Sequence, residues 1–202
     1  MLKRTLTILI LTILLVTAPL TAFSYKHLES VPIANGVFLV STPELKDSPF
    51  NQTVILIISY GADGAVGLVI NKPTNFSVRK VLPEIRINRK GISSMYMGGP
   101  VDWDNIYMLL TSETLPYGTQ HVIENIYFTF RKDIITSLLE EKDTKNKVRV
   151  YSGYTGWAPG QLEQEINRGA WITVKADTKK VFSNNPLSIW PFYFSGPEEL
   201  LI

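Results

Sequence analysis

The sequence predicts an α+β fold with a largely antiparallel or barrel-like sheet and about three short helices. Apolar, β-branched runs follow one another along the chain with short turns between them, which favours hairpins over parallel βαβ units. Clear helical periodicity is confined to short segments. With 202 residues, of which 45% are hydrophobic and 19% charged, the chain is long and apolar enough for one globular domain.

The first 24 residues have the composition of a secretory signal peptide. Two basic residues precede the apolar run Leu6–Val16, and small residues follow it at Ala18, Ala22 and Ser24. This is the three-part order of a positive start, an apolar middle and a small-residue cleavage site. Cleavage is expected after Ser24, and cleavage after Ala22 is nearly as consistent with the pattern.

The leader divides the chain into residues 1–24 and a single domain over residues 25–202, and it predicts a periplasmic or otherwise exported protein. Two alternatives stay open. The apolar stretch 6–23 is just long enough to span a bilayer, so an uncleaved membrane anchor is one of them. The other is a cytoplasmic protein with an apolar N-terminal tail.

Charge argues against a nucleic-acid partner. The chain has 20 basic and 18 acidic residues, a formal charge of +2, and Lys3 and Arg4 in the leader account for this excess. Nucleic-acid binders normally carry a basic stripe that neutralises phosphates. Here Lys and Arg are interleaved with acids, and the basic groups at 86–90 and 142–147 are typical of solvated loops.

The absence of cysteine from the sequence excludes several kinds of chemistry. With none in the sequence, there is no disulfide, no thiol nucleophile, no thiolate metal site and no lipoprotein attachment site. His27 and His121 lie 94 positions apart, without carboxylates at metal-ligand spacing. No Gly-x-Ser-x-Gly elbow is present. The sequence therefore predicts no cofactor, no metal and no catalytic triad.

Eight strands and three helices are expected along the chain. The expected strands are residues 36–41, 53–60, 65–70, 95–97, 105–110, 126–130, 148–154 and 171–175. The turn at 61–64 predicts that the second and third strands form a hairpin. The expected helices are a short one capped by Ser77 and ended by Pro83, a second at 132–141, and a third at 159–168.

The N-terminal connecting segment is expected to be loosely attached, whereas the C-terminal end is expected to pack on the domain. Residues 25–35 are interpreted as a tether, and Pro73 is expected to stop the third strand because it lacks a backbone donor. A parallel βαβ arrangement is expected at most near 132–150. The C-terminal end includes Trp190, Phe192, Tyr193 and Phe194, and this aromatic content predicts that it docks on the domain.

Four segments together resemble the YqgE/AlgH family, also catalogued as UPF0301 or DUF179. They are Phe38-Leu-Val-Ser-Thr-Pro43, Asp63-Gly-Ala-Val-Gly-Leu-Val-Ile-Asn-Lys-Pro73, Met97-Gly-Gly-Pro-Val101 and Gly153-Tyr-Thr-Gly-Trp-Ala-Pro-Gly-Gln-Leu-Glu-Gln-Glu165 with Trp171 beyond. The resemblance covers roughly residues 36–183 and implies an α+β fold. It implies no established reaction, although one branch is named for an effect on alginate gene regulation. Typical members lack a leader and are thought cytoplasmic, so the leader here departs from the pattern.

The stretch from Tyr151 to Trp171 is the strongest signature and has two interpretations. Gly153, Gly156 and Gly160 are expected to form a turn that holds Trp157. This arrangement suits either a ligand or partner site or a well-specified structural corner, and the corner is favoured.

Two carboxylates follow on the expected helix. Glu163 and Glu165 suggest a pair for general acid and base roles. Residues two apart on a helix point about 200° around the axis and do not face each other, so a catalytic pair is disfavoured. We expect Glu165 to pair with Arg168 and Glu163 to lie in the first turn, near the positive end of the helix dipole.

Two further places carry candidate residues. Asn71 and Lys72 end a buried strand, where a lysine can grip an anion. Gly98 and Gly99 form a sharp turn that lacks the spacing of a Walker phosphate loop, so turn chemistry is favoured there.

The sequence favours a non-catalytic binding or accessory protein of the cell envelope, with an unidentified protein partner or small ligand. The candidate binding residues are Asn71, Lys72, Gly98, Gly99, Trp157, Gly160, Gln161, Glu163 and Glu165. The alternative is an enzyme of unrecognised class that uses Lys72 with Glu163 or Glu165. The third is a transcription-linked regulator, as suggested for one family branch.

Overall fold

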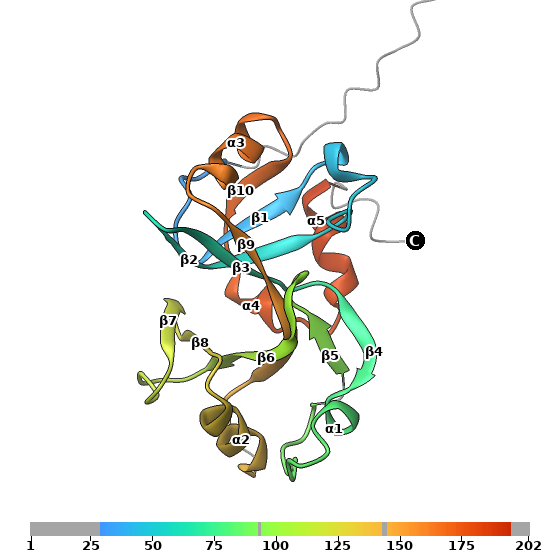
Figure 1. Ribbon diagram of the computed structural model, residues 1–202, viewed down its shortest axis with the longest axis vertical. Helices are drawn as coiled ribbons and strands as arrows, with labels where there is room; N and C mark the ends of the chain where they lie inside the picture. The colour runs from blue at the N-terminus through green and yellow to red at the C-terminus, as the bar shows by residue number, and fades with distance from the viewer. Residues whose placement is uncertain (1–28, 93, 143–144, 195–202) are drawn as a thin grey trace, which may run out of the picture.

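The computed structural model describes residues 29–92, 94–142 and 145–194 (Figure 1). The expected leader, residues 1–24, lies outside the described residues. No helix within them has the length and apolar character needed to cross a bilayer.

Ten strands form an open and mostly antiparallel sheet, which confirms the predicted α+β class. The strands are β1 (Val37–Ser41), β2 (Val54–Gly61), β3 (Gly64–Val69), β4 (Pro73–Ser77), β5 (Ser94–Met97), β6 (Val101–Thr111), β7 (Gln120–Ile123), β8 (Ile126–Thr129), β9 (Val148–Trp157) and β10 (Trp171–Lys175). Their order is β10-β1-β2-β3-β9-β6-β8-β7, with β5 joined to β9 in parallel and β4 added outside β5. The sheet is not closed into a barrel.

The helices are short, and the described part of the chain has more of them than the sequence predicts. The α-helices are α1 (Val78–Val81), α2 (Lys132–Glu140), α3 (Gln161–Asn167), α4 (Thr178–Val181) and α5 (Ile189–Phe194), and the 3₁₀ turns are η1 (Pro43–Leu45) and η2 (Pro186–Ser188). The predicted helices at 132–141 and 159–168 correspond to α2 and α3. Ser77 precedes α1, but its side chain makes no capping hydrogen bond.

Strand β9 joins the two halves of the molecule. Its last residues pair with β3, as in Ala65 with Trp157, and its earlier part pairs with β6. Figure 1 shows β9 running from the half that contains β5, β6 and α2 to the half that contains β1, β2, β3 and α3. Helix α2 connects β8 to β9 on opposite sides of β6, so the expected parallel crossover is present, with one strand between.

The predicted hairpin is confirmed, and its strands are buried on both faces. Strands β2 and β3 pair from Ile55–Val69 to Gly61–Gly64. Successive side chains of β2 enter different clusters: Leu56 and Ile58 join the central core, while Ile55 and Ile57 pack under α3. This alternation follows from the period of two along a strand.

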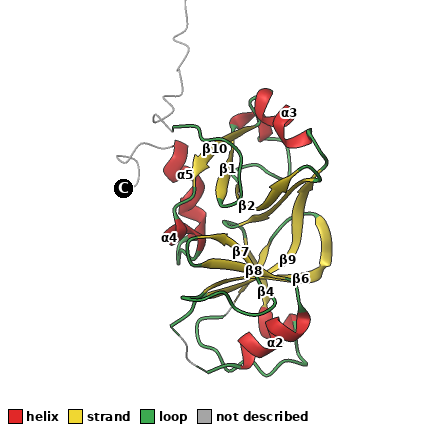
Figure 2. Cartoon of the chain, turned by 90° about the vertical axis from the view of Figure 1, so that its left-hand side faces the viewer, coloured by secondary structure: helices red, strands yellow, loops and turns green. Residues whose placement is uncertain are grey.

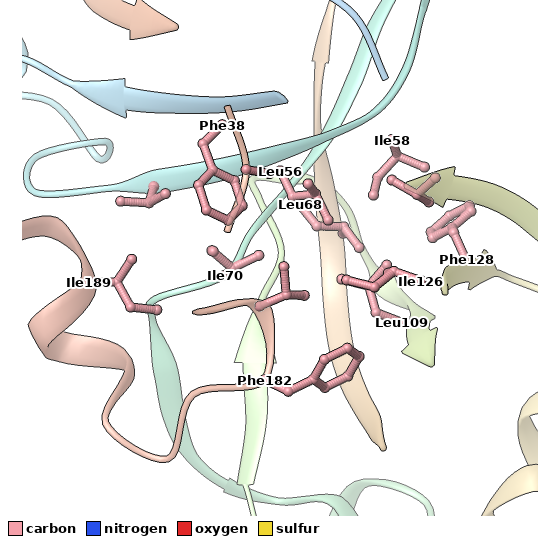
Figure 3. Close-up of a cluster of buried hydrophobic side chains, with 14 of the residues drawn as sticks. Phe38, Leu56, Ile58, Leu68, Ile70, Leu109, Ile126, Phe128, Phe182 and Ile189 are labelled. Atoms are coloured by element: carbon pink, nitrogen blue, oxygen red, sulfur yellow. The ribbon is translucent and has the colours of Figure 1, made fainter. Parts of the chain in front are cut away.

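The central core lies between the two halves of the sheet and is closed by the C-terminal segment (Figure 3). Ile189 and Tyr193 of α5 are 3% and 4% exposed, and Tyr193 packs edge-on against Phe38. The Trp190 indole N–H donates to the Ser41 carbonyl oxygen over 2.8 Å. The prediction that the aromatic C-terminal residues dock on the domain is confirmed for Trp190 and Tyr193, and residues 195–202 lie outside the described residues. Helices α4 and α5 lie along one side of the sheet in Figure 2.

Of two interpretations of connecting segments, the tether was wrong and the strand stop was right. Residues 29–35 are the described part of the expected tether, and they are attached to the domain. The Val31 N–H donates to the Thr173 carbonyl oxygen of β10, and Ile33 packs on the apolar cluster under α3. The expected stop of the third strand before Pro73 is confirmed, since β3 ends at Val69; Pro73 then begins β4, where its missing donor costs nothing in the ladder.

Candidate functional site

The signature segment Tyr151–Trp171 folds as the end of β9, a turn, α3 and the start of β10. The expected glycine-rich turn is therefore smaller than predicted. Gly153 and Gly156 belong to β9, and only Gly160, with φ of 76°, lies in the turn before α3. Gly153 also has a positive φ, 67°, and a Cβ there would lie 2.4 Å from the Gly99 carbonyl oxygen and 2.8 Å from the Val101 carbonyl oxygen, so this position requires glycine.

Glu165 ties this corner together. Its carboxylate accepts hydrogen bonds from the Trp157 indole N–H over 2.9 Å, the Trp171 indole N–H over 2.8 Å and the Gln161 side-chain amide over 3.0 Å. The two indole rings meet edge-to-face with centroids 6.2 Å apart. The expected pairing of Glu165 with Arg168 is wrong: no ion pair among the described residues joins them, because Glu165 turns inward to the indoles.

Glu163 faces a different neighbour. Its carboxylate accepts a hydrogen bond of 2.6 Å from the Tyr60 hydroxyl at the end of β2. This hydrogen bond lowers the pKa of Glu163 and raises the pKa of Tyr60. Because Glu163 and Glu165 have separate partners, the two carboxylates do not form an acid–base pair.

A shallow hollow of about 430 Å³ lies beside the corner. The tip of the β2–β3 hairpin forms one wall, with Asp63 exposed, and Tyr154, Gly156 and Trp157 of β9 form another. Of the nine predicted site residues, Trp157 lines this hollow. Gly160 lies in the turn before α3, and Gln161 is the first residue of that helix. Both are exposed and follow Trp157 closely in the sequence.

The polar residues at the end of β3 are bonded into the framework. The side-chain oxygen of Asn71, which is 3% exposed, accepts from the Val54 N–H over 2.8 Å, and its amide donates to the Gln52 carbonyl over 2.9 Å. Lys72 Nζ donates to the Asn51 carbonyl over 2.7 Å, and burial lowers the pKa of Lys72. Among the described ion pairs, none joins Lys72 to Glu163 or Glu165.

Gly98 and Gly99 are buried against the backbone of β9. A Cβ at Gly98 would lie 2.2 Å from the Gly153 carbonyl oxygen, and one at Gly99 would lie 2.2 Å from the Tyr154 carbonyl group. Both positions therefore require glycine for close strand packing. The structure does not bring Asn71, Gly98 and Gly99 together as walls of one groove, and a ligand role for them stays a prediction.

His121 has a local partner. Its Nε2 lies 2.8 Å from the Glu124 carbonyl oxygen, and its ring packs on Tyr127. His27 lies outside the described residues. No group of three potential metal-binding side chains occurs within the described ranges.

Sequence reasoning missed a second hollow, which is lined by basic residues. The groups at 86–90 and 142–147, interpreted as solvated loop charges, meet around a cavity of about 630 Å³ together with Arg149 of β9. Arg89 is 5% exposed rather than solvated. One signal was present: Arg149 lies between Val148 and Val150 at the start of β9, and an arginine within a largely buried strand needs a specific environment.

Comparison with known proteins decides the family. The AlgH-like family model, DUF179, matches residues 38–194. The chain belongs to the AlgH-like family. A UPF0301 protein of Desulfotalea psychrophila is 37% identical over 152 residues, which cover 73% of this chain and 78% of that protein. A UPF0301 protein of Pseudoalteromonas translucida is 34% identical over 158 residues, 76% of this chain and 85% of that protein.

Solved structures agree with this assignment. The solution structure of the AlgH protein from Pseudomonas aeruginosa, a UPF0301 protein, is similar with a TM-score of 0.69 and 27% identity, over 86% of this chain and 96% of that one. A crystal structure of a Corynebacterium diphtheriae protein has a TM-score of 0.64 at 22% identity, over 77% of this chain and 82% of that one. The second likeness shows the shared fold alone.

Proposed function

We propose that this AlgH-like chain is a non-catalytic binding protein that contacts a protein partner at the signature corner. One observation carries the proposal. The carboxylates of the Tyr151–Trp171 segment are hydrogen-bonded to other side chains of the protein, while the hollow beside them is open. Glu165 and Glu163 are held by indole and tyrosine donors. These hydrogen bonds fix the shape of the surface around the corner. Among the described residues of the corner they do not bring an acid, a base and a nucleophile together.

The enzyme alternative needs Lys72 to act with Glu163 or Glu165. Its support is the lowered pKa of Lys72, which favours the neutral amine. Against it, Lys72 donates to a backbone carbonyl and forms no ion pair with either carboxylate among the described residues. The regulator alternative draws on the family resemblance alone, and salt-dependent DNA binding by the purified chain is the result that would favour it.

Site-specific photo-crosslinking tests the partner surface. A photoreactive residue at Asp63, exposed on the rim of the hollow, is expected to give a discrete protein adduct in cells. The same residue at Glu140, exposed at the end of α2, is the matched control and is expected to give none. Adducts of equal intensity at both positions, or none at Asp63, would contradict the proposed surface.

We further propose that the chain works in the cell envelope, on the basis of its N-terminal leader pattern. Cell fractionation followed by N-terminal sequencing tests this location. The expected result is an exported product that begins at Phe23 or Tyr25. An intact product in the membrane fraction would favour the anchor instead, and a soluble cytoplasmic product beginning at Met1 would refute export.

A further inference from the structure

The basic cavity lies away from the signature corner, where distant parts of the sequence meet. Its walls come from the loop before β5, the start of β9 and the segment after α4. Five cationic side chains line it, and no acidic side chain occurs among its described lining residues. These cations are Arg89, Lys90, Lys145, Lys147 and Arg149.

Arg149 is the fixed element of the cavity. Its guanidinium donates to the Val181 carbonyl over 2.6 Å and to the Ser183 carbonyl over 2.8 Å. The same guanidinium lies 4.1 Å from the centroid of the Tyr96 ring. No ion pair involves Arg149 among the described residues. Carbonyl dipoles and an aromatic face orient the guanidinium without cancelling its charge, so it retains its attraction for an anion.

Arg89 also lines the cavity and is held by backbone carbonyls. It is 5% exposed, and its guanidinium donates to the Leu138 carbonyl over 2.9 Å and to the Asn146 carbonyl over 2.6 Å. Glu141 lies 3.7 Å away, with a half-exposed carboxylate. Arg89 is therefore a fixed part of the wall whose charge Glu141 partly balances, and the positive charge open to a ligand comes from Arg149 and the exposed Lys145 and Lys147.

An unpartnered hydroxyl lies beside the Arg149 wall. Tyr151 is fully buried, and its hydroxyl has no hydrogen-bond partner in the described structure. Arg149 is close enough to oppose the rise in the Tyr151 pKa that burial causes, although the geometry falls short of a hydrogen bond. The Tyr151 ring packs against Tyr96, which lines the cavity. Tyr151 is not among the lining residues, so its hydroxyl does not itself face the cavity, and Arg149 and Tyr96 are the groups that connect it to the cavity wall.

Size and wall composition narrow the ligand class. A volume of about 630 Å³ lies within the range of small-molecule sites and is concave, unlike the extended basic stripe of a nucleic-acid binder. Lys145, Lys147 and Arg149 form no ion pair among the described residues, and a single carboxylate would balance only one of these three charges. A phosphate monoester carries close to two charges at neutral pH and matches them better. Tyr96, Phe182 and Pro186 add apolar wall for an organic group.

We propose that this cavity binds a small phosphorylated organic molecule, with the phosphate between Arg149, Lys145 and Lys147 and the organic group along Tyr96 and Phe182. The site is independent of the signature corner, so the crosslinking result at Asp63 and the result below can differ. The same phosphate chemistry occurs in free metabolites and in lipid headgroups. The experiment therefore includes both sources.

Isothermal titration calorimetry of the purified chain with glycerol 3-phosphate and with inorganic pyrophosphate, at constant ionic strength, tests the site. A double variant, Lys145→Gln with Lys147→Gln, is expected to weaken both affinities at least tenfold. These lysines are exposed, so folding is retained. The matched control is Lys142→Gln, an exposed lysine of the same loop that does not line the cavity, and it is expected to bind as the wild type does.

Vesicles distinguish the two phosphate sources. Lysine-dependent binding to phosphatidylcholine vesicles that contain phosphatidic acid, but not to pure phosphatidylcholine, would identify a lipid headgroup. Lysine-dependent binding of glycerol 3-phosphate alone would identify a free metabolite. The proposal is overturned by equal affinities for the wild type and the double variant, by no binding to any phosphate probe, or by preference for a single-stranded oligonucleotide.

Discussion

Glu165 shows how one side chain holds a corner of this fold together. Its carboxylate accepts from two indole N–H groups whose tryptophans, Trp157 and Trp171, are 6% and 3% exposed. Buried donors of this kind are costly when they lose their acceptor. The corner is therefore a polar network within an apolar cluster.

The substitution Glu165→Ala leaves both indole donors without this acceptor. We expect the free energy of unfolding to fall by about 3 kcal/mol, since each unsatisfied buried donor costs about 1–3 kcal/mol. The measurement is urea denaturation followed by tryptophan fluorescence. Gln164→Ala changes the exposed neighbour on α3 and is the control. Equal midpoints for the two variants would show that Glu165 does not hold the corner.

The Tyr60–Glu163 hydrogen bond predicts a dependence of stability on pH. Because the pKa of Glu163 is lowered in the folded state, its contribution is present above the ordinary value of 4.5 and is lost as the pH falls through the folded value. The pKa of Tyr60 is raised, so its contribution is present below the ordinary value of 10.0 and is lost as the pH rises through the folded value.

The variant Tyr60→Phe removes the hydroxyl donor and keeps the ring. We expect wild type and variant to differ most in urea midpoint at neutral pH and to converge in acid, where Glu163 becomes protonated in both states. Urea titrations at several pH values measure this convergence. A difference that stays constant into acid would assign the effect to packing of Tyr60 instead of the hydrogen bond.

At the scale of elements, the contact between β5 and β9 depends on glycine. The Gly98 N–H donates to the Ser152 carbonyl and the Gly98 carbonyl accepts from the Val69 N–H, so its backbone bridges β9 and β3. Such close approach leaves no room for a side chain.

The variant Gly98→Ala places a methyl group 2.2 Å from the Gly153 carbonyl oxygen. We expect a loss of at least about 3 kcal/mol in stability, because rigid backbone on both sides cannot move apart locally. Gly61→Ala is the control, since a Cβ there meets nothing within 4 Å. Thermal denaturation of the two variants compares them, and similar melting temperatures would contradict the packing argument.

At the scale of the whole molecule, one core is shared by segments from both ends of the described chain. Phe38 of β1 packs against Tyr193 of α5, and Ile189 closes the same cluster. Because the two halves of the sheet meet over this core, the C-terminal segment stabilises the whole domain.

Two substitutions in this segment separate core packing from local effects. Ile189→Ala removes a side chain that is 3% exposed, and we expect it to cost about 3 kcal/mol. Leu187→Ala removes one that is 68% exposed, and we expect it to change stability by less than about 0.5 kcal/mol. Differential scanning calorimetry gives both values, and equal effects would mean that the segment is not part of the core.

Much of the fold could be predicted because it depends on local pattern. The hairpin of β2 and β3 follows from two apolar runs around Gly61 and Gly64, and α2 follows from its apolar spacing. Strand β4 could not be predicted, because its residues pair only through contact with β5 and carry no alternating pattern of their own.

The sequence by itself determined the α+β class, the family and the importance of the Tyr151–Trp171 segment, since these reside in contiguous residues. Only the tertiary structure decided how side chains are used. It turned Glu165 toward two indoles, bonded Asn71 into the backbone, and brought the basic residues at 89–90 and 145–147 around one cavity with Arg149. Contacts between residues far apart in the chain depend on strand register and packing, which a one-dimensional pattern does not contain.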